Sequence, residues 1–211
     1  MMTFSVRAPR PASVVFNALA LLALCVMLGL ALVWEFAYGH APDSSGQLQR
    51  LAYLLAGAGL LLNLRFGPSP VHYALVLAAA LGGTVAAGSQ VLSRLAPGAP
   101  ALSGPQASTW ALAGYAALLV YCTFMLALDR KASDNAMPRR VGVLTALPMW
   151  LFLIVALAAT TAAGLRCGVS ACPAPGEGYA WLAPEWEPVP VLADLQPAAR
   201  AAPAPLAGAP R

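Results

Sequence analysis

The residues of this 211-residue chain best suited to chemistry are its last two cysteines, in the segment Cys167-Gly-Val-Ser-Ala-Cys172-Pro. Four residues separate the two thiols, and one of them is glycine, so the chain can turn back between them. Such a turn can bring the two Cα atoms within the roughly 4.4–6.8 Å that a disulfide requires. The spacing predicts either a stable structural disulfide or an exchangeable redox pair, and both interpretations stay open.

The other two cysteines, Cys25 and Cys122, lie inside long apolar segments. A thiol in such surroundings is neutral and behaves as a small hydrophobic group, so we expect both to serve packing. The only histidines, His40 and His72, fall at opposite ends of the helix pair predicted between residues 48 and 94. This separation argues against a shared metal site, and we expect no metal.

The composition places these residues in a membrane protein. The chain is 60% hydrophobic and 9% charged, whereas soluble domains have about a quarter charged residues. A net charge of +4 without a basic stripe and interleaved aromatics argues against nucleic-acid binding. We predict an all-α polytopic membrane protein whose domain covers residues 13–172. Its five predicted transmembrane helices span about 14–38, 48–66, 71–94, 108–129 and 141–165.

The first apolar run, from Val14 to Trp34, has a competing interpretation as a cleaved signal peptide. Residues 37–39, Ala-Tyr-Gly, resemble a small-x-small cleavage site. Signal peptides carry an apolar region of about 7–15 residues, and this run is longer. The sequence therefore favours a retained transmembrane helix that enters the lipid bilayer from a short N-terminal segment, residues 1–12.

Positive charges indicate the orientation of the five helices. Most of them flank the helix ends that would share a side with the N-terminus, and by the positive-inside rule that side is the cytoplasm. These residues are Arg7, Arg10, Arg65, Arg130, Lys131, Arg139 and Arg140. In a Gram-negative bacterium the C-terminus is then periplasmic, so Cys167 and Cys172 lie in an oxidising compartment. Residues 173–211 are rich in proline and alanine and predict a disordered periplasmic tail.

The second and third predicted helices are joined by a tight turn. Gly67, Pro68 and Pro70 punctuate the sequence LNLRFGPSPVHYALVL, and these residue types favour a turn between two apolar runs. This sequence resembles the second and third helices of the disulfide-bond formation protein B (DsbB) family of bacterial inner-membrane proteins. The resemblance implies a DsbB-like four-helix bundle, to which this chain adds a fifth transmembrane helix.

The loop before the second helix matches the family only in part. The family pattern reads Pro-Cys-Pro-Leu-Cys-x-x-Gln-Arg, and the frame from Pro42 to Arg50 keeps its proline, glutamine and arginine. Asp43 and Gly46 stand where the two cysteines would be. The segment around Cys167 and Cys172 resembles a Cys-Gly-x-x-x-Cys-Pro element found after the fifth helix in one branch of the family.

The resemblance implies a thiol–disulfide oxidoreductase. Members pass an electron pair from a periplasmic thioredoxin-like thiol protein of the DsbA type, through cysteine pairs, to quinone. Cys167 and Cys172 are the candidate redox pair, and Arg50 matches the family's quinone-associated arginine. The alternatives for Arg50 are a quinone contact and an interfacial anchor, and we expect Glu35 to be a solvated rim residue paired loosely with it. The alternative function is a catalytically silent paralogue that acts as a membrane scaffold or a partner- or quinone-binding protein.

Overall fold

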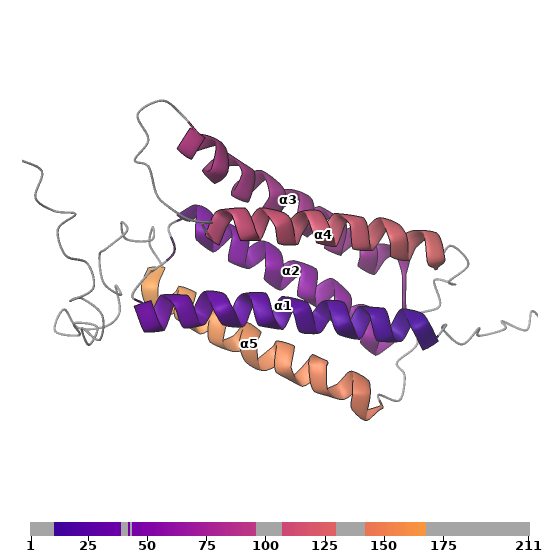
Figure 1. Cartoon of the computed structure of the whole chain (residues 1–211). Helices are drawn as coiled ribbons and strands as arrows, with labels where there is room; N and C mark the ends of the chain where they lie inside the picture. The colour runs from indigo at the N-terminus through magenta and orange to yellow at the C-terminus, as the bar shows by residue number, and fades with distance from the viewer. Residues whose placement is uncertain (1–10, 39–41, 43, 96–106, 130–141, 168–211) are drawn as a thin grey trace, which may run out of the picture.

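The protein folds into a bundle of long helices (Figure 1). The computed structural model describes residues 11–38, 42, 44–95, 107–129 and 142–167, and in these ranges it contains helices and no strand. The predicted all-α class is therefore confirmed. The helices are α1 (Pro11–Tyr38), α2 (Ser44–Phe66), α3 (Pro70–Leu95), α4 (Ala107–Leu128) and α5 (Val143–Cys167). The N-terminal residues 1–10 and the predicted tail at 173–211 lie outside the described residues.

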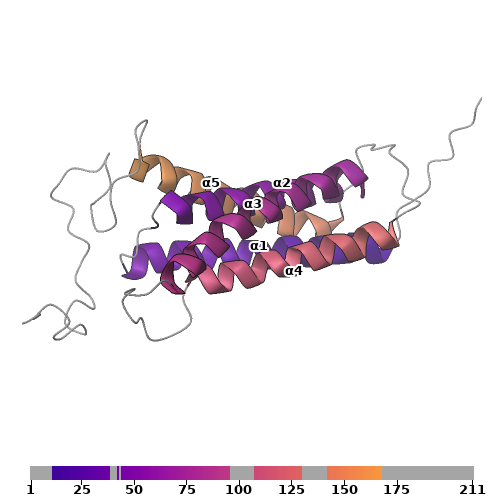
Figure 2. The same cartoon turned by 90° about the horizontal axis from the view of Figure 1, so that it is seen from above.

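The central element of the bundle is α2. It packs against α3, α1 and α5, while α4 packs on α3 and α5 also packs on α1. Figure 2 shows that the helices run roughly along the long axis of the molecule. In this view α5 lies on the opposite side of the bundle from α4. The C-terminal ends of α1, α3 and α5 and the N-terminal ends of α2 and α4 lie at one end of the molecule (Figure 1). We call this the Arg50 end.

Four of the five described helices are long and apolar enough to cross a membrane, namely α1, α3, α4 and α5. Their outward faces carry exposed large apolar side chains, such as Val33, Val85 and Leu157, as expected for a surface in contact with lipid. Together with the length and composition of the helices, this confirms the prediction of a multi-pass helical membrane protein.

The helix α2 is long enough to span a bilayer but is less apolar than its neighbours. Its 23 residues correspond to about 35 Å at the usual helical rise. Its polar side chains face protein rather than lipid, since Gln49, Arg50 and Asn63 are all buried. A helix surrounded by other helices can carry such residues because they find partners inside the bundle.

Glycines allow the helices to approach one another closely. A Cβ atom placed on Gly57 of α2 would lie 2.1 Å from the ring of Phe152 on α5. A Cβ atom on Gly83 of α3 would lie 2.2 Å from the ring of Tyr115 on α4. Aromatic rings therefore occupy the space that side chains at these two positions would need. In lipid, where dispersion contacts and hydrogen bonds drive helix association, such close packing stabilises the bundle.

The turn between α2 and α3 is held by its own hydrogen bonds. Gly67 adopts φ 106°, a left-handed conformation that glycine accepts without strain. Its amide donates to the carbonyl of Asn63 at 3.0 Å, which closes the end of α2. The Ser69 amide donates to the Asn63 side-chain oxygen at 3.1 Å, and the Val71 amide donates to the Ser69 hydroxyl at 3.3 Å. These bonds fix α3 antiparallel to α2.

Candidate functional site

The side chain of Arg50 lies inside the bundle, near the start of α2. It is 6% exposed, and its Nη2 donates to Glu35 Oε2 at 2.6 Å. Glu35 is 2% exposed, so the expectation of a solvated rim residue paired loosely with Arg50 is wrong. Successive helix residues point about 100° apart, and Trp34 and Phe36 on either side of Glu35 face outward. The carboxylate therefore turns inward, where it forms a buried ion pair.

Part of the Arg50 guanidinium remains available to a ligand. Within the described part of the chain, its Nη1 is buried and has no hydrogen-bond partner. The Nε2 of Gln47, one turn earlier on α2, is in the same condition. Buried donors are rarely left without an acceptor. These two nitrogens can therefore take up an oxygen acceptor at the Arg50 end.

A frame of polar and aromatic side chains fixes this part of α2 in place. Gln49 Nε2 donates to Gln90 Oε1 on α3 at 2.8 Å, and the Tyr115 hydroxyl donates to the Gln49 carbonyl. The Tyr53 hydroxyl donates to the carbonyl of Ala111 at 2.9 Å. The rings of Tyr53 and Tyr115 stack with their centroids 4.3 Å apart. These contacts hold the Arg50 segment rigidly against α3 and α4.

The structure places only one member of the predicted redox pair. Cys167 is the last residue of α5, so its backbone lies at the Arg50 end. Its side chain and all of Cys172 lie outside the described residues, as does Asp43. Gly46 lies in the first turn of α2, which begins at Ser44 rather than near residue 48. The predicted disulfide therefore stays a prediction.

Comparison with known families bears on the part of the bundle that holds Arg50. Residues 13–113 match the family model described as Disulfide bond formation protein DsbB. Over these residues the chain is similar to the DsbB family. It comprises α1, α2, α3 and the start of α4, and it includes the Glu35–Arg50 ion pair. No curated protein and no solved structure matches the chain.

The matched segment contains Arg50, and Asp43 and Gly46 stand where the resemblance would place the two loop thiols. The helix α5 and Cys167 lie beyond the matched residues. The two buried thiols do not replace the missing pair, because Cys25 and Cys122 are both free cysteines of the core. Across the described residues, no three His, Cys, Asp or Glu side chains gather as metal ligands would.

A second polar cluster of the DsbB-like bundle lies at the other end and was not predicted. Asn63 donates to the Asn17 side-chain oxygen at 3.1 Å, and Asn17 donates to the Tyr73 hydroxyl at 2.9 Å. The Tyr73 hydroxyl donates to Asp129 at 3.1 Å, and Ser13 donates to the other Asp129 oxygen at 2.6 Å. The cluster connects α1, α2, α3 and the end of α4. The only sequence signal was a set of isolated polar residues near the ends of apolar runs.

The histidine of the turn belongs to the same end of the bundle. His72 Nδ1 lies 3.1 Å from the Asn63 side-chain oxygen, within hydrogen-bond distance. This contact gives His72 a structural role at the start of α3. The other histidine, His40, lies outside the described residues.

Proposed function

We propose that this protein is a thiol–disulfide oxidoreductase of the bacterial inner membrane. It would take electrons from a periplasmic thioredoxin-like thiol protein of the DsbA type and pass them to quinone. The observation that carries the proposal is the DsbB-like segment with Arg50 buried in it and one Arg50 nitrogen unpartnered. The orientation follows from the charge distribution, with the N-terminus cytoplasmic and the C-terminus periplasmic.

The reaction begins at the predicted Cys167–Cys172 disulfide. A partner thiolate attacks one sulfur, and the other leaves as a thiolate. The second partner thiol then attacks the mixed disulfide, so the partner leaves oxidised, and Cys167 and Cys172 are left reduced. Two electrons and two protons have moved from the partner to this chain. The site is regenerated when Cys167 and Cys172 lose two electrons and two protons and close the disulfide again.

The residue that fits a quinone is Arg50. A quinone, when bound, supplies the two-electron acceptor. Arg50 offers a buried cationic donor to a carbonyl oxygen, and its charge favours the more electron-rich, reduced ring. Glu35 holds the guanidinium in position through the ion pair at 2.6 Å. The unpartnered Nη1 thus fits a carbonyl acceptor without any rearrangement of the ion pair.

The fold supports a direct role for the C-terminal cysteines. The sequence alone gave no reason for the segment after the fifth helix to approach Arg50. In the bundle, α5 packs on α1 and α2 and ends with Cys167 at the Arg50 end. This arrangement supports thiol chemistry near Arg50 without the loop cysteines of the family.

The second candidate function is a catalytically silent scaffold that binds a partner or quinone. It is favoured by the segment from Pro42 to Arg50, where Asp43 and Gly46 stand in place of the family's cysteines. Neither side chain can exchange disulfides, so the family's usual route between thiol partner and quinone is interrupted.

An assay of quinone reduction by the purified full-length protein, with a reduced thiol partner as electron donor, distinguishes the two functions. We expect slow turnover that Cys167→Ser abolishes and Cys25→Ser leaves unchanged. The double variant Asp43→Cys, Gly46→Cys should raise the rate by restoring the family's loop pair. No turnover in the unmodified protein, with a gain only in the double variant, would establish the scaffold with an intact quinone site.

A further inference from the structure

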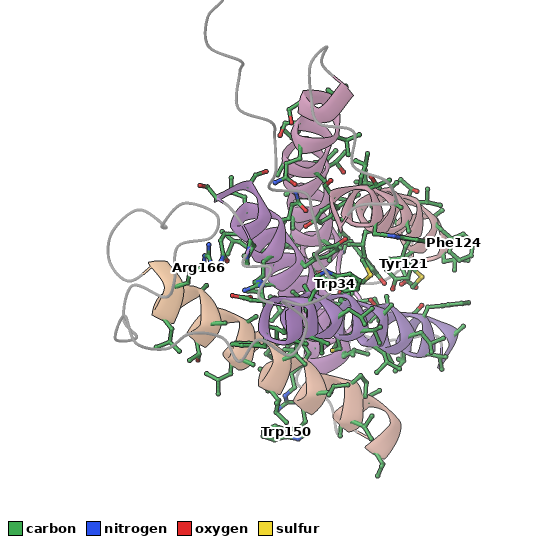
Figure 3. The ribbon with its side chains drawn as sticks, turned by 60° about the vertical axis from the view of Figure 1, so that its left-hand side comes forward. Trp34, Tyr121, Phe124, Trp150 and Arg166 are labelled. Carbon is green, nitrogen blue, oxygen red and sulfur yellow. The ribbon has the colours of Figure 1, made fainter. Side chains whose placement is uncertain are left out.

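Arg166 is the largest side chain that is fully enclosed in the described structure. It occupies the last turn of α5 and is 1% exposed. It continues the buried face of α5, on which Phe152, Ala159 and Ala162 precede it at helical spacing. Figure 3 shows its side chain leaving the end of α5 on the side of α2. The guanidinium therefore points into the bundle, although it lies close to a membrane surface.

One edge of the Arg166 guanidinium has no acceptor. Its Nε and Nη2 are both buried without a hydrogen-bond partner among the described residues. These two nitrogens form the side edge of the guanidinium fork, which binds two oxygens of one carboxylate or phosphate group. A single carbonyl oxygen would leave one of the two donors unsatisfied. The pattern therefore points to an oxyanion.

The free edge of Arg166 faces the part of α2 that carries Arg50. Phe152 of α5 packs against Gly57 of α2. Arg50 precedes Gly57 by seven residues, and Arg166 follows Phe152 by fourteen, so both arginines lie near the contacting faces of the two helices. Helix side chains tilt toward the N-terminus of their own helix. Because α2 and α5 are antiparallel, this tilt brings the two guanidinium groups toward each other.

The charges at this end do not balance among the described residues. Arg50 and Arg166 contribute two buried positive charges, whereas the only described carboxylate at this end is Glu35. Glu35 follows the exposed Trp34, and tryptophan is enriched at the depth of lipid headgroups. The site thus has the charge and the depth to receive one phosphate group.

We propose that the free edge of Arg166 binds the phosphate of an anionic phospholipid headgroup. This site is separate from the proposed redox reaction, in which Arg166 takes no part. A phosphodiester carries one negative charge and two free oxygens, which matches the fork of Arg166 and the excess charge of the site. The bound lipid would anchor the end of α5 against α2.

The test is lipid binding by the full-length protein in detergent, followed by native mass spectrometry and thermal unfolding. The probes are phosphatidylglycerol, phosphatidylcholine with the same acyl chains, and inorganic phosphate. The variants are Arg166→Gln and the control Arg65→Gln, which removes an arginine at the opposite end. Arg166→Lys retains the positive charge but lacks the two parallel N–H donors of the guanidinium. It replaces Arg166→Gln in the binding test if the glutamine variant does not fold.

We expect phosphatidylglycerol to bind and stabilise the protein and its Arg65→Gln variant, and to bind more strongly than phosphatidylcholine, whose choline is a cation. Arg166→Gln should weaken phosphatidylglycerol binding by about tenfold or more, the loss expected for charge-assisted hydrogen bonds. Arg166→Lys should bind phosphatidylglycerol with intermediate affinity. Equal binding by Arg166→Gln and the unmodified protein would overturn the site, as would equal binding of both lipids. If inorganic phosphate alone gave the full stabilisation, the ligand would be the free anion and the lipid assignment would be wrong.

Discussion

The buried ion pair between Glu35 and Arg50 makes the sharpest prediction about stability. Glu35→Gln retains the size of the side chain and an oxygen acceptor but removes the negative charge. The Arg50 guanidinium, 6% exposed, would then remain inside the bundle without its counter-charge. Removing one partner of a buried pair is far more damaging than removing an exposed one, because the remaining charge is not solvated.

The separation of the charges gives the size of this effect. At 2.6 Å, two unit charges attract by about 6 kcal/mol when the effective dielectric constant is about 20. Desolvation of both groups opposes this attraction, and measured losses for broken buried pairs are about 3–5 kcal/mol. We expect about 3 kcal/mol for Glu35→Gln, since the amide still accepts a hydrogen bond. A solvated rim pair would contribute only about 0.2–1 kcal/mol.

The assay is a double-mutant cycle of Glu35→Gln and Arg50→Gln, measured by reversible unfolding in mixed micelles. The double variant should lose less free energy of unfolding than the sum of the two single variants, because each single variant leaves one unpaired buried charge and the double variant leaves none. Thr160→Val is the control, since this exposed hydroxyl bonds only to carbonyls of its own helix. A loss below about 1 kcal/mol in Glu35→Gln, with additive effects in the cycle, would refute the buried pair.

Three further predictions concern packing, the second polar cluster and the orientation. Gly83→Ala should lower the free energy of unfolding by about 1–3 kcal/mol, because its Cβ would meet the ring of Tyr115 on α4. Gly82→Ala, which has open space around its Cβ, should be nearly neutral in the same unfolding assay. Equal losses in the two variants would contradict the packing. Asn17→Leu should cost roughly 1–3 kcal/mol through the polar groups it leaves unpaired, and an unchanged unfolding curve would argue against the cluster. A reporter active only in the periplasm should work when fused after Leu182 and fail when fused at Ser133; the reverse result would invert the proposed topology.

The helical architecture was accessible from the sequence because apolar runs of membrane length have few alternative structures. Low charge and runs such as residues 14–34 were enough to predict a five-helix membrane protein. The turn after α2 was likewise signalled by Gly67, whose left-handed φ explains why glycine stands there. The central position of α2 was not predicted, since composition does not tell which helix the others surround.

The site was predictable only where a family pattern existed. The resemblance to the family pattern singled out Arg50. The burial of Glu35 could not be predicted in this way, because it depends on which helices pack against it, and hydropathy does not give the exposure of a single residue. The sequence did not single out Arg166, because an arginine at a helix end usually reaches water. The Asn17–Asn63 hydrogen bond joins residues 46 positions apart. Long-range partners of this kind follow from tertiary packing alone.

The polar character of α2 has a consequence for how the chain enters the membrane. A segment that carries Gln49, Arg50 and Asn63 gains little from lipid when it is alone, because each polar group would lose water without finding a partner. Its most extensive neighbour, α3, follows after only residues 67–69. We therefore expect α2 to remain at the translocation machinery until α3 has been synthesised, so that the two helices leave together. Biosynthesis of this bundle would then depend on the speed with which one helix follows the other.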